Sequence, residues 1–318
     1  MFNIDKQYYV DQVKKYKDLN DATSKAKYNK AIQILCNISY EWFVNVVAPE
    51  AFGITKWYDF QKYIIHDIDI HLPNQKLRYI LNMPQQHGKS VLIFMLLAWL
   101  LGTYPNQQAM YLTYNEERAI DGANGVKIVM KTKIYQQIFP QIKLRQTLDR
   151  NNINENTRNI KENSTRFDVV DNKGKPYNGK FYSMSFFQDI PGKSVHNIVV
   201  DDYHSSMVQA ESIINRNKIW DIYRSTIVGR SQIGGSRIMI VSTRYHDDDI
   251  VGRITKDTWA IPYIHRVFPA IQTDEGRSYD PRPIGTPLMD VRTDLYSDMQ
   301  KDLTQWWCIW QQMPLNTI

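Results

Sequence analysis

Features that mark disulfide-rich, metal-binding and membrane-spanning proteins are scarce in this sequence. Its 318 residues include only two cysteines, Cys36 and Cys308, and their positions fit neither a disulfide framework nor a metal-ligand pattern. The N-terminus lacks the basic and then apolar layout of a signal peptide. The longest apolar run, residues 91–101, is too short to span a bilayer. Together with the low cysteine content, these absences favour a globular protein of a reducing cytosol.

The excess of one charge is also small. The sequence has 39 lysines and arginines against 33 aspartates and glutamates, a formal net charge of +6. This balance is compatible with a polyanionic partner, but many enzymes carry as much, so charge alone does not decide the function. With 43% hydrophobic and 23% charged residues, a chain of this length can form one large or two modest domains with a substantial core.

Apolar spacing along the chain predicts an α/β protein. Residues 1–50 show helical spacing and predict one or two helices that pack on the main domain. A further helix is predicted over 58–71, and from there strand and helix patterns alternate, which is typical of a mostly parallel sheet flanked by helices. The predicted strands are 77–83, 108–114, 165–170, 180–186, 196–201, 236–242 and 261–268. The predicted helices are 90–102, 116–136, 209–226, 247–256 and 293–311.

This pattern divides the chain into three expected regions. Residues 1–57 form an N-terminal helical segment, 58–270 form the core domain, and 271–318 form an extended connection followed by a C-terminal helix. The polar, Asn-rich residues 145–165 predict a surface loop within the core domain. The prolines and glycines of 272–290 explain why that connection is expected to be extended.

The most informative segment is 83–90, with the sequence MPQQHGKS between a predicted strand and a predicted helix. This layout is that of a phosphate-binding P-loop, in which backbone N–H groups and a helix dipole face phosphate oxygens. Lys89 is expected to reach the β- and γ-phosphates, and Ser90 to place its hydroxyl on Mg²⁺. The pattern usually opens with glycine, whereas Met83 holds that position here. The residues predicted to hold the nucleotide are Pro84, Gln85, Gln86, His87, Gly88, Lys89 and Ser90.

Two acids follow another apolar strand. Asp201 and Asp202 come at the end of the predicted strand 196–201, roughly 110 residues after Lys89. In P-loop enzymes the first acid holds Mg²⁺, and the second can orient and deprotonate the attacking water. We therefore predict that Asp201 is a magnesium ligand and that Asp202 is the general base. Solvated acids at a strand end are common on their own, but their position after a P-loop supports the catalytic interpretation.

Polar residues also follow the predicted strand 236–242. Thr243 is expected to sense the γ-phosphate, and Arg244 to pair with a phosphate or with a carboxylate. Because ligands gather at the carboxyl ends of strands in α/β sheets, these residues, the P-loop and the two acids are expected at one sheet edge. Asp247 and Asp248 are interpreted as caps of the next helix, whose dipole favours acids at its start.

Gln61 is a further candidate. A glutamine upstream of a P-loop can bind the edge of an adenine, because its amide both donates and accepts hydrogen bonds. A lone glutamine on a helix is usually just solvated, so this prediction depends on the other motifs.

As a set, these motifs resemble those of the large terminase subunit of tailed bacteriophages, the motor that pumps DNA into a procapsid. The segment 84–90 is similar to that family's deviant Walker A motif, which often lacks the opening glycine. The segment 201–204 is similar to its Walker B motif, in which Asp-Asp is an alternative to Asp-Glu. The segments 100–115 and 242–253 resemble its second strand region and its coupling motif. The likeness runs in order from about residue 58 to 314.

The resemblance implies a fold, a reaction and partners. It implies a P-loop NTPase of the ASCE type that uses ATP and Mg²⁺ to translocate double-stranded DNA into a procapsid. Full-length members carry a second, RNase H-like nuclease domain, and this sequence ends where their ATPase domain ends, so no DNA cleavage is expected from this chain. The implied partners are double-stranded DNA, the portal of the procapsid, the small terminase subunit and further copies in a ring. The implied location is the host cell cytoplasm, with transient docking on the procapsid.

The resemblance to a ring motor also directs attention to basic residues. A neighbouring subunit supplies an arginine in such motors, and Arg145 and Arg150 lie in the polar loop where such a finger would be presented. Lys127, Lys131 and Lys133 are candidates for contacts with the DNA backbone, which carries no sequence information. A solvated surface charge is the ordinary interpretation of each of these residues taken singly.

Two alternatives remain open. A helicase-like or other DNA-stimulated ATPase would share the nucleotide site, but it would need a second motor domain, and residues after 270 show no such series of strands and helices. A nucleotide-binding module that has lost activity would account for Met83 and Asp202. The presence of Lys89, Ser90, Asp201 and Asp202 together argues against that loss.

Overall fold

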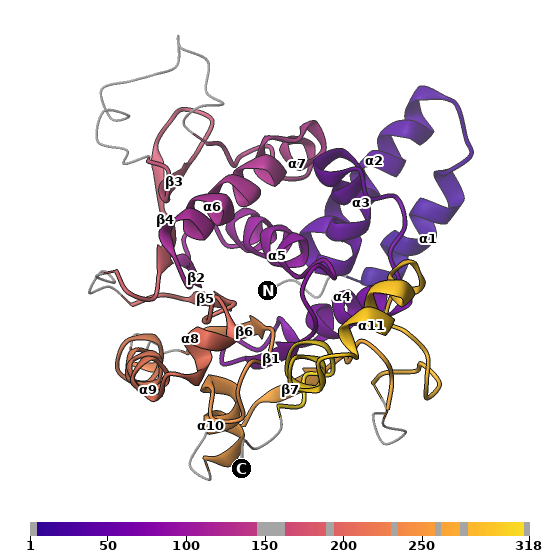
Figure 1. The fold of residues 1–318 in the computed structure, drawn as a ribbon. Helices are drawn as coiled ribbons and strands as arrows, with labels where there is room; N and C mark the ends of the chain where they lie inside the picture. Colours follow the sequence, from indigo (N-terminus) through magenta and orange to yellow (C-terminus); the bar gives the residue numbers. More distant parts are fainter. Residues whose placement is uncertain are drawn as a thin grey trace.

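The centre of the fold is a seven-stranded sheet. The computed structural model describes residues 5–144, 163–188, 194–229, 235–257, 262–273 and 279–314. The strands are β1 (Arg78–Asn82), β2 (Ala109–Thr113), β3 (Arg166–Val170), β4 (Pro176–Ser185), β5 (Asn197–Asp201), β6 (Arg237–Ser242) and β7 (Ile264–Val267). Their order across the sheet is β3-β4-β2-β5-β6-β1-β7, and every pair is parallel except β3 with β4 (Figure 1). The predicted α/β fold with a mostly parallel sheet is confirmed, and each predicted strand is present.

Side chains alternate between the two faces of the sheet, as the two-residue period of a strand requires. In β1, Tyr79 and Leu81 join one buried cluster, whereas Ile80 joins another on the opposite face. In β2, Tyr111 belongs to the first cluster and Met110 to the second. Both faces are therefore buried, which explains why the strands are nearly continuous apolar runs in the sequence.

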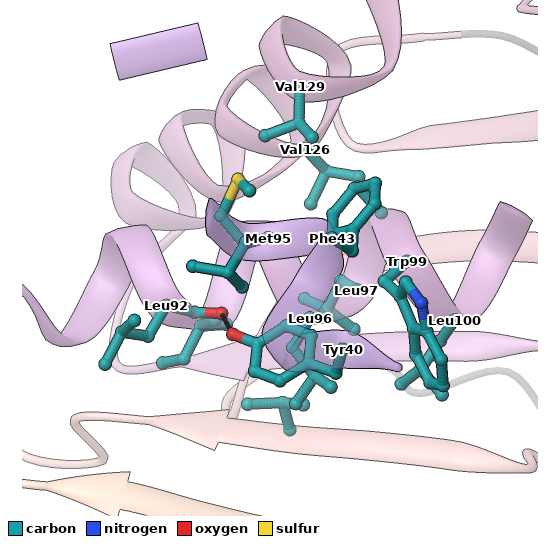
Figure 2. Packing of buried hydrophobic residues seen from close by; sticks show 14 of the residues in the cluster. Tyr40, Phe43, Leu92, Met95, Leu96, Leu97, Trp99, Leu100, Val126 and Val129 are labelled. Atoms are coloured by element: carbon teal, nitrogen blue, oxygen red, sulfur yellow. Dashed lines mark hydrogen bonds between the residues drawn. The ribbon is translucent and has the colours of Figure 1, made fainter. Parts of the chain in front are cut away.

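The first face is covered by a layer of helices with α5 at its centre (Figure 1). This layer contains α3 (Tyr40–Phe52), α4 (Asp59–His71), α5 (Lys89–Thr103), α6 (Glu116–Lys131) and α7 (Lys133–Ile138). Figure 2 shows Tyr40 and Phe43 of α3, and Val126 and Val129 of α6, packed around the apolar side chains of α5. The Tyr40 hydroxyl donates to the Leu92 carbonyl at 2.8 Å. Packing on all sides explains why α5 lacks a polar face, and it fixes the helix whose first residues belong to the predicted P-loop.

The second face is covered by α8 (Met207–Glu211), α9 (Ile213–Ile222) and α10 (Ile250–Lys256). Ile219 of α9 and Val251 of α10 are buried in the cluster that contains Ile80. The helix predicted over 247–256 begins three residues later, because the Asp249 side chain accepts a hydrogen bond from the Gly252 N–H and caps it.

Three predicted helices are interrupted by capping side chains. The helix predicted over 116–136 divides at Thr132, which caps α7, and the one over 209–226 divides at Ser212, which caps α9 before a π-helical turn at Tyr223–Val228. The helix predicted over 293–311 consists of α11 (Thr293–Met299), α12 (Leu303–Gln305) and a π-helical turn. Asp302 caps α12. Short polar side chains can bond the backbone locally, so they end helices whose apolar spacing continues.

The N-terminal segment contains three helices rather than the predicted one or two. They are α1 (Lys6–Tyr16), α2 (Ala22–Ile38) and α3, and the chain bends by 115° between α2 and α3. Ser39 caps α3, and Asp69 of α4 accepts from the Ser39 hydroxyl at 2.9 Å and from the Tyr40 N–H at 2.6 Å. The contact with α4 interrupts the helix at Ser39, although the apolar spacing of the sequence continues past this residue. Of the described helices, none is by itself long and apolar enough to cross a membrane, and only the bent α2–α3 pair meets that test jointly.

Replacing Leu97 with alanine is expected to lower the free energy of unfolding by about 2–5 kcal/mol. Leu97 is completely buried in the middle of α5, so the change removes apolar contacts and leaves a cavity. Urea denaturation followed by circular dichroism measures the effect. Leu303→Ala is the matched control, because Leu303 is 66% exposed and its loss should change stability by less than about 0.5 kcal/mol. Equal effects of the two changes would contradict the assigned packing of α5.

Candidate nucleotide site at one edge of the sheet

Three neighbouring strands, β5, β6 and β1, end at one edge of the sheet. Asn82, at the end of β1, donates from Nδ2 to the Ser242 carbonyl at 3.1 Å and to its hydroxyl at 3.0 Å. The Asp202 N–H, just beyond β5, donates to the Val241 carbonyl at 3.1 Å. The structure therefore brings together the loop 83–88, the two acids and Thr243, as the sequence predicts.

The loop between β1 and α5 turns at Gln86 and Gly88 rather than at its first position. Gln86 has φ = 59° and Gly88 has φ = 88°, whereas Met83 is not among the described residues with a positive φ. Two features favour glycine at position 88. Its positive φ strains any larger residue, and a Cβ atom there would lie 2.7 Å from Nε2 of Gln61. Because the backbone at Met83 has no positive φ, this position does not require glycine and a buried methionine fits there. This accounts for the departure from the usual motif.

Gln61 holds this loop from α4. Its Nε2 donates to the His87 carbonyl at 3.1 Å, and its Oε1 accepts from the Tyr58 N–H at 3.1 Å. The side chain is buried, 7% exposed. The described contacts thus give Gln61 a role in positioning the loop, and its predicted role in adenine binding stays a prediction.

Lys89 lies at the point where the strand ends meet. Its Nζ donates to Thr243 Oγ1 at 2.6 Å and to the Met83 carbonyl at 3.2 Å, and lies 3.7 Å from Asp202 Oδ1. The residue is only 5% exposed. A buried ammonium group is costly unless it is paired and hydrogen-bonded, and these acceptors supply those partners. They hold the ammonium group at the start of α5. A phosphate bound there would be attracted both by the lysine charge and by the helix dipole.

Asp201 is buried beside Ser90. Its Oδ2 accepts from the Tyr111 hydroxyl at 2.7 Å and lies 3.4 Å from Ser90 Oγ. Its Oδ1 is buried and has no hydrogen-bond partner among the described residues. Burial, and then the neighbouring Asp202 carboxylate, raise the pKa of Asp201 well above its usual range, although the Tyr111 hydrogen bond opposes this. A carboxylate in this environment is stabilised by a cation.

These residues fit a magnesium ion. Mg²⁺ prefers oxygen ligands and is usually bound through one or two carboxylates together with substrate phosphates. The orphaned Oδ1 of Asp201 and the nearby Ser90 hydroxyl offer such oxygens. The metal would be held by Ser90 and Asp201, and it would neutralise charge that develops on phosphate oxygens.

The raised pKa of Asp201 predicts a pH-dependent stability of the nucleotide-free protein. An aspartate whose folded pKa exceeds its unfolded pKa takes up a proton on folding, so this contribution to stability is lost as pH rises through the folded value. Asp201→Asn should therefore stabilise the protein by on the order of 1 kcal/mol at pH 8 and by less at pH 5. Thermal unfolding without Mg²⁺ or nucleotide measures this. A destabilising effect that is equal at both pH values would contradict the assigned environment.

Asp202 is held in an orientation suited to a base. Its backbone is left-handed, with φ = 43°, a conformation that Asp and Asn adopt more readily than most residues. Its Oδ1 accepts from the Thr243 N–H at 2.8 Å, and the side chain is 26% exposed. One carboxylate oxygen is thus fixed, and the group borders the cavity at the sheet edge.

Arg244 pairs with a carboxylate, one of the two outcomes that the sequence left open. Its Nε donates to Asp249 Oδ2 at 2.7 Å, and the side chain is buried. Asp249, rather than Asp247 or Asp248, caps α10, so the predicted capping role of those two acids is wrong. Asp247 pairs with Lys256, and Asp248 with Arg216 and Arg253. The Thr243–Arg244 segment is therefore tied directly to the start of α10.

The His87 side chain faces the C-terminal segment. Its Nε2 lies 2.5 Å from the Tyr296 hydroxyl, its Nδ1 lies 2.6 Å from the Gln85 carbonyl, and the ring stacks on Tyr296. The imidazole is buried, which lowers its pKa to about 4. Arg292 also donates to Gln86 at 3.0 Å, and the Gln312 side chain accepts from the Arg244 N–H at 2.9 Å. The C-terminal segment thus contacts both the predicted P-loop and the segment after β6.

A polar cavity of about 430 Å³ opens between these elements. Five of the predicted P-loop residues line it together with both acids, whereas the side chains of Pro84 and His87 are not in its lining. Other lining residues were not predicted from the sequence, because the likeness of segment 100–115 to a terminase strand region assigned no ligand role to β2 or to the turn after it. The lining residues are Gln85, Gln86, Gly88, Lys89, Ser90, Val91, Tyr111, Thr113, Tyr114, Arg118, Asp201, Asp202, His204, Ser205 and Tyr245.

The remaining basic candidates have different surroundings. Arg145 and Arg150, and most of the predicted polar loop 145–165, lie outside the described residues. Lys127 is buried and donates to the Asn163 carbonyl at 3.2 Å, so the prediction that it contacts DNA is wrong. Lys131 and Lys133 are exposed, and a role in DNA contact stays a prediction for them.

Comparison with solved structures decides which kind of P-loop fold this is. The ATPase domain of the Thermus phage P74-26 large terminase superposes with a TM-score of 0.53 at 13% identity, over 82% of this chain and 95% of that domain. A point variant of the same domain gives 0.56 at 12% identity, over 84% and 97%. The fold is that of a large terminase ATPase domain. No protein-family model matches the sequence, and no curated protein matches it.

The likeness to the terminase ATPase domain concerns the fold, because the identities are low. The chain also matches the bacteriophage HK97 large terminase with a TM-score of 0.46 at 14% identity. That match covers 73% of this chain but only 44% of the HK97 protein. The matched part of this chain covers 95–97% of the P74-26 ATPase domain and 44% of the HK97 protein.

Proposed function

We propose that this protein is an ATPase that hydrolyses ATP to drive viral DNA packaging, as the motor subunit of a terminase. The proposal combines the terminase ATPase fold with the chemistry at the sheet edge. The observation that carries it is the position of Lys89, which lines the cavity and whose ammonium group is held by two P-loop carbonyls, Thr243 and Asp202. A buried cation there matches the charge of a triphosphate.

In the proposed reaction, water attacks the γ-phosphorus of ATP. The water oxygen bonds to that phosphorus, and the bond from the phosphorus to the β–γ bridging oxygen breaks, so that ADP leaves with the electron pair. Asp202 orients the water and accepts its proton, which then passes to solvent. Lys89 neutralises charge on the transferred phosphoryl group. The contact of Thr243 with both Lys89 and Asp202 supports a role in sensing the γ-phosphate.

Hydrolysis would move α10 and the C-terminal segment. Arg244 follows Thr243 directly and pairs with Asp249, the capping residue of α10. Gln312 accepts from the Arg244 N–H, so a shift of Thr243 would also reach residues near the C-terminal end of the described chain. We propose that this chain of contacts transmits the nucleotide state to movement of DNA.

The proposed partners are double-stranded DNA, the portal of the procapsid, the small terminase subunit and further copies of this chain in a ring. Packaging must tolerate any sequence, so the DNA would be held through its phosphates, with Lys131 and Lys133 as exposed candidates. The proposed location is the host cell cytoplasm, docked on the procapsid during packaging.

Stimulation of ATP hydrolysis by DNA tests the motor proposal. Turnover should rise when double-stranded DNA of unrelated sequences is added, by the same factor for each, and the effect should decline steeply with salt because phosphate contacts release counterions. Phosphate release is measured over a series of protein concentrations, because a ring forms only as concentration rises. Lys89→Met is run in parallel to correct for contaminating ATPases. Turnover that is unaffected by DNA at every concentration would leave an ATPase but contradict the motor role.

A further inference from the structure

We propose that Arg118 contacts the terminal phosphate of the nucleotide bound to its own subunit and stabilises the charge that develops there during hydrolysis. The inference deepens the proposed ATPase function and rests on it. It assigns a catalytic cation to the described part of the chain, in addition to any arginine that a neighbouring subunit supplies.

Arg118 lies at the edge of the sheet where the cavity opens. Arg118 lies in the first turn of α6, directly after β2, and β2 pairs with β5, the strand that ends at Asp201. It lines the same cavity as Lys89, Ser90 and both acids. Among the described lining residues, Lys89 and Arg118 are the only cations. They come from opposite sides of the Walker B acids, since Lys89 begins the helix after β1 and Arg118 follows β2.

The hydrogen bonding of Arg118 is the second argument. Its Nε donates to the Tyr114 hydroxyl at 3.2 Å, and no ion pair with a carboxylate is found for it among the described residues. Most arginines near this site are already paired, as Arg244 is with Asp249 and Arg216 with Asp248. The remaining N–H groups of Arg118 are therefore available for an anion. Tyr114 orients the guanidinium without neutralising it.

The helix context of Arg118 is the third argument. A cation in the first turn of a helix opposes the helix dipole, which favours acids there. Glu116 and Glu117 follow that preference, and Arg118 departs from it. The unfavourable position of the Arg118 charge is explained if its guanidinium binds an anion in the cavity. The positive charge of Arg118 also reaches the site. It lowers the pKa of Asp201 and so partly offsets the effects of burial and of the Asp202 carboxylate, which raise it.

An arginine at this point suits the chemistry. The transition state of phosphoryl transfer spreads charge over the γ-phosphoryl oxygens, and a guanidinium can donate two parallel hydrogen bonds to such oxygens. The deviant loop 83–88 contains no lysine or arginine before Lys89. The described nucleotide site would therefore have a single cation without Arg118.

Steady-state ATP hydrolysis by Arg118→Ala, Arg118→Lys and Glu117→Ala tests the inference. We expect Arg118→Ala to lower kcat by roughly 10²–10³-fold, the range for loss of one donor to developing charge. Arg118→Lys should restore part of that loss, and Glu117→Ala, which is exposed on the same helix turn, should stay near the wild type. Affinity for ADP should be unchanged in all of them, because ADP lacks the terminal phosphate. Thermal unfolding should show no loss of stability, because Arg118 is exposed.

A mixing experiment tests whether Arg118 acts within its own subunit. Arg118→Ala is mixed with Lys89→Met, which has an intact Arg118 but a damaged nucleotide site. The mixture should be no more active than Arg118→Ala alone. Restored activity would show that Arg118 acts on a neighbouring subunit and would overturn the inference.

Three further outcomes would also overturn it, and one of them distinguishes it from the ATPase proposal. If Arg118→Ala keeps kcat within 3-fold of the wild type while the wild type exceeds Lys89→Met, the ATPase stands and the role of Arg118 fails. If Arg118→Ala hydrolyses ATP normally without DNA but loses binding to DNA, Arg118 is a DNA contact. If the wild type itself does not exceed Lys89→Met, the ATPase proposal fails and this inference fails with it.

Discussion

Lys89→Met is expected to reduce ATP turnover by about 10³-fold and to weaken binding of a non-hydrolysable ATP analogue by at least about 10-fold. The ammonium group lies between Thr243 Oγ1 and Asp202 Oδ1, so it is held where a triphosphate would need a positive charge. Methionine keeps most of the buried aliphatic stem and removes only the charge and its hydrogen bonds. Turnover is measured as phosphate release, and affinity by titration calorimetry.

Two controls separate chemistry from folding in this variant. Thermal unfolding should show a folded protein, because the stem still fills its place beside the loop. Lys62→Met is the matched change, since Lys62 is exposed on α4 and, within the described part of the chain, its one ion pair is with Asp59. A Lys89→Met protein that is folded and as active as Lys62→Met would contradict the assigned phosphate site.

Asp202→Asn is expected to bind ATP about as tightly as the wild type and to hydrolyse it roughly 10²–10⁴-fold more slowly. Asparagine accepts the hydrogen bond from the Thr243 N–H and tolerates the left-handed backbone at this position, so the loop should keep its structure. It cannot accept a proton from water. The variant should therefore hold nucleotide without turning it over, which a fluorescent ATP analogue and phosphate release measure side by side.

Asp247→Asn is the matched control for Asp202→Asn. Asp247 pairs with Lys256 and does not line the cavity, so its loss should leave turnover within a few-fold of the wild type. An Asp202→Asn protein that retains more than a tenth of wild-type turnover would exclude Asp202 as the base. Loss of binding together with turnover would instead indicate that the carboxylate orients the loop.

The sheet and the nucleotide motifs could be predicted from the sequence because both depend on local patterns. The buried strands are apolar runs such as 197–201 and 237–242, and polar residues follow each run at its carboxyl end. Parallel pairing then brings those polar residues together whatever the intervening loops do. For this reason the sequence alone predicts that Lys89, Asp201, Asp202 and Thr243 lie at one edge of the sheet.

Other features depend on contacts between distant residues and left no local signal. Ser39 ends α2 because Asp69 of α4 binds it, although the apolar spacing continues past that point. From the sequence, Arg244 could equally have paired with a phosphate. It pairs with Asp249 because α10 places that carboxylate beside it. His87 sits in a phosphate-binding motif, but Tyr296, far along the chain, turns its ring away from the cavity. Such tertiary partners cannot be read from spacing.

Met83 stands where the usual P-loop motif has its first glycine. The sequence marks the missing glycine, and the structure explains it, since the positive φ angles fall at Gln86 and Gly88 and the Met83 carbonyl accepts from Lys89. The loop therefore keeps the lysine in place without the first glycine. Gly88→Ala should disturb this loop much more than Met83→Leu, because alanine is strained at φ = 88° and its Cβ atom would displace the Gln61 amide from the His87 carbonyl.

The most direct test of the proposed nucleotide site is the rate of phosphate release from Mg·ATP by the purified protein with double-stranded DNA, over a series of protein concentrations. We expect a rate that exceeds that of Lys89→Met by at least about 100-fold at the highest concentration, with no release when Mg²⁺ is removed. Equal rates for the two proteins across the series, with both folded, would contradict the claim that this sheet edge binds and hydrolyses ATP.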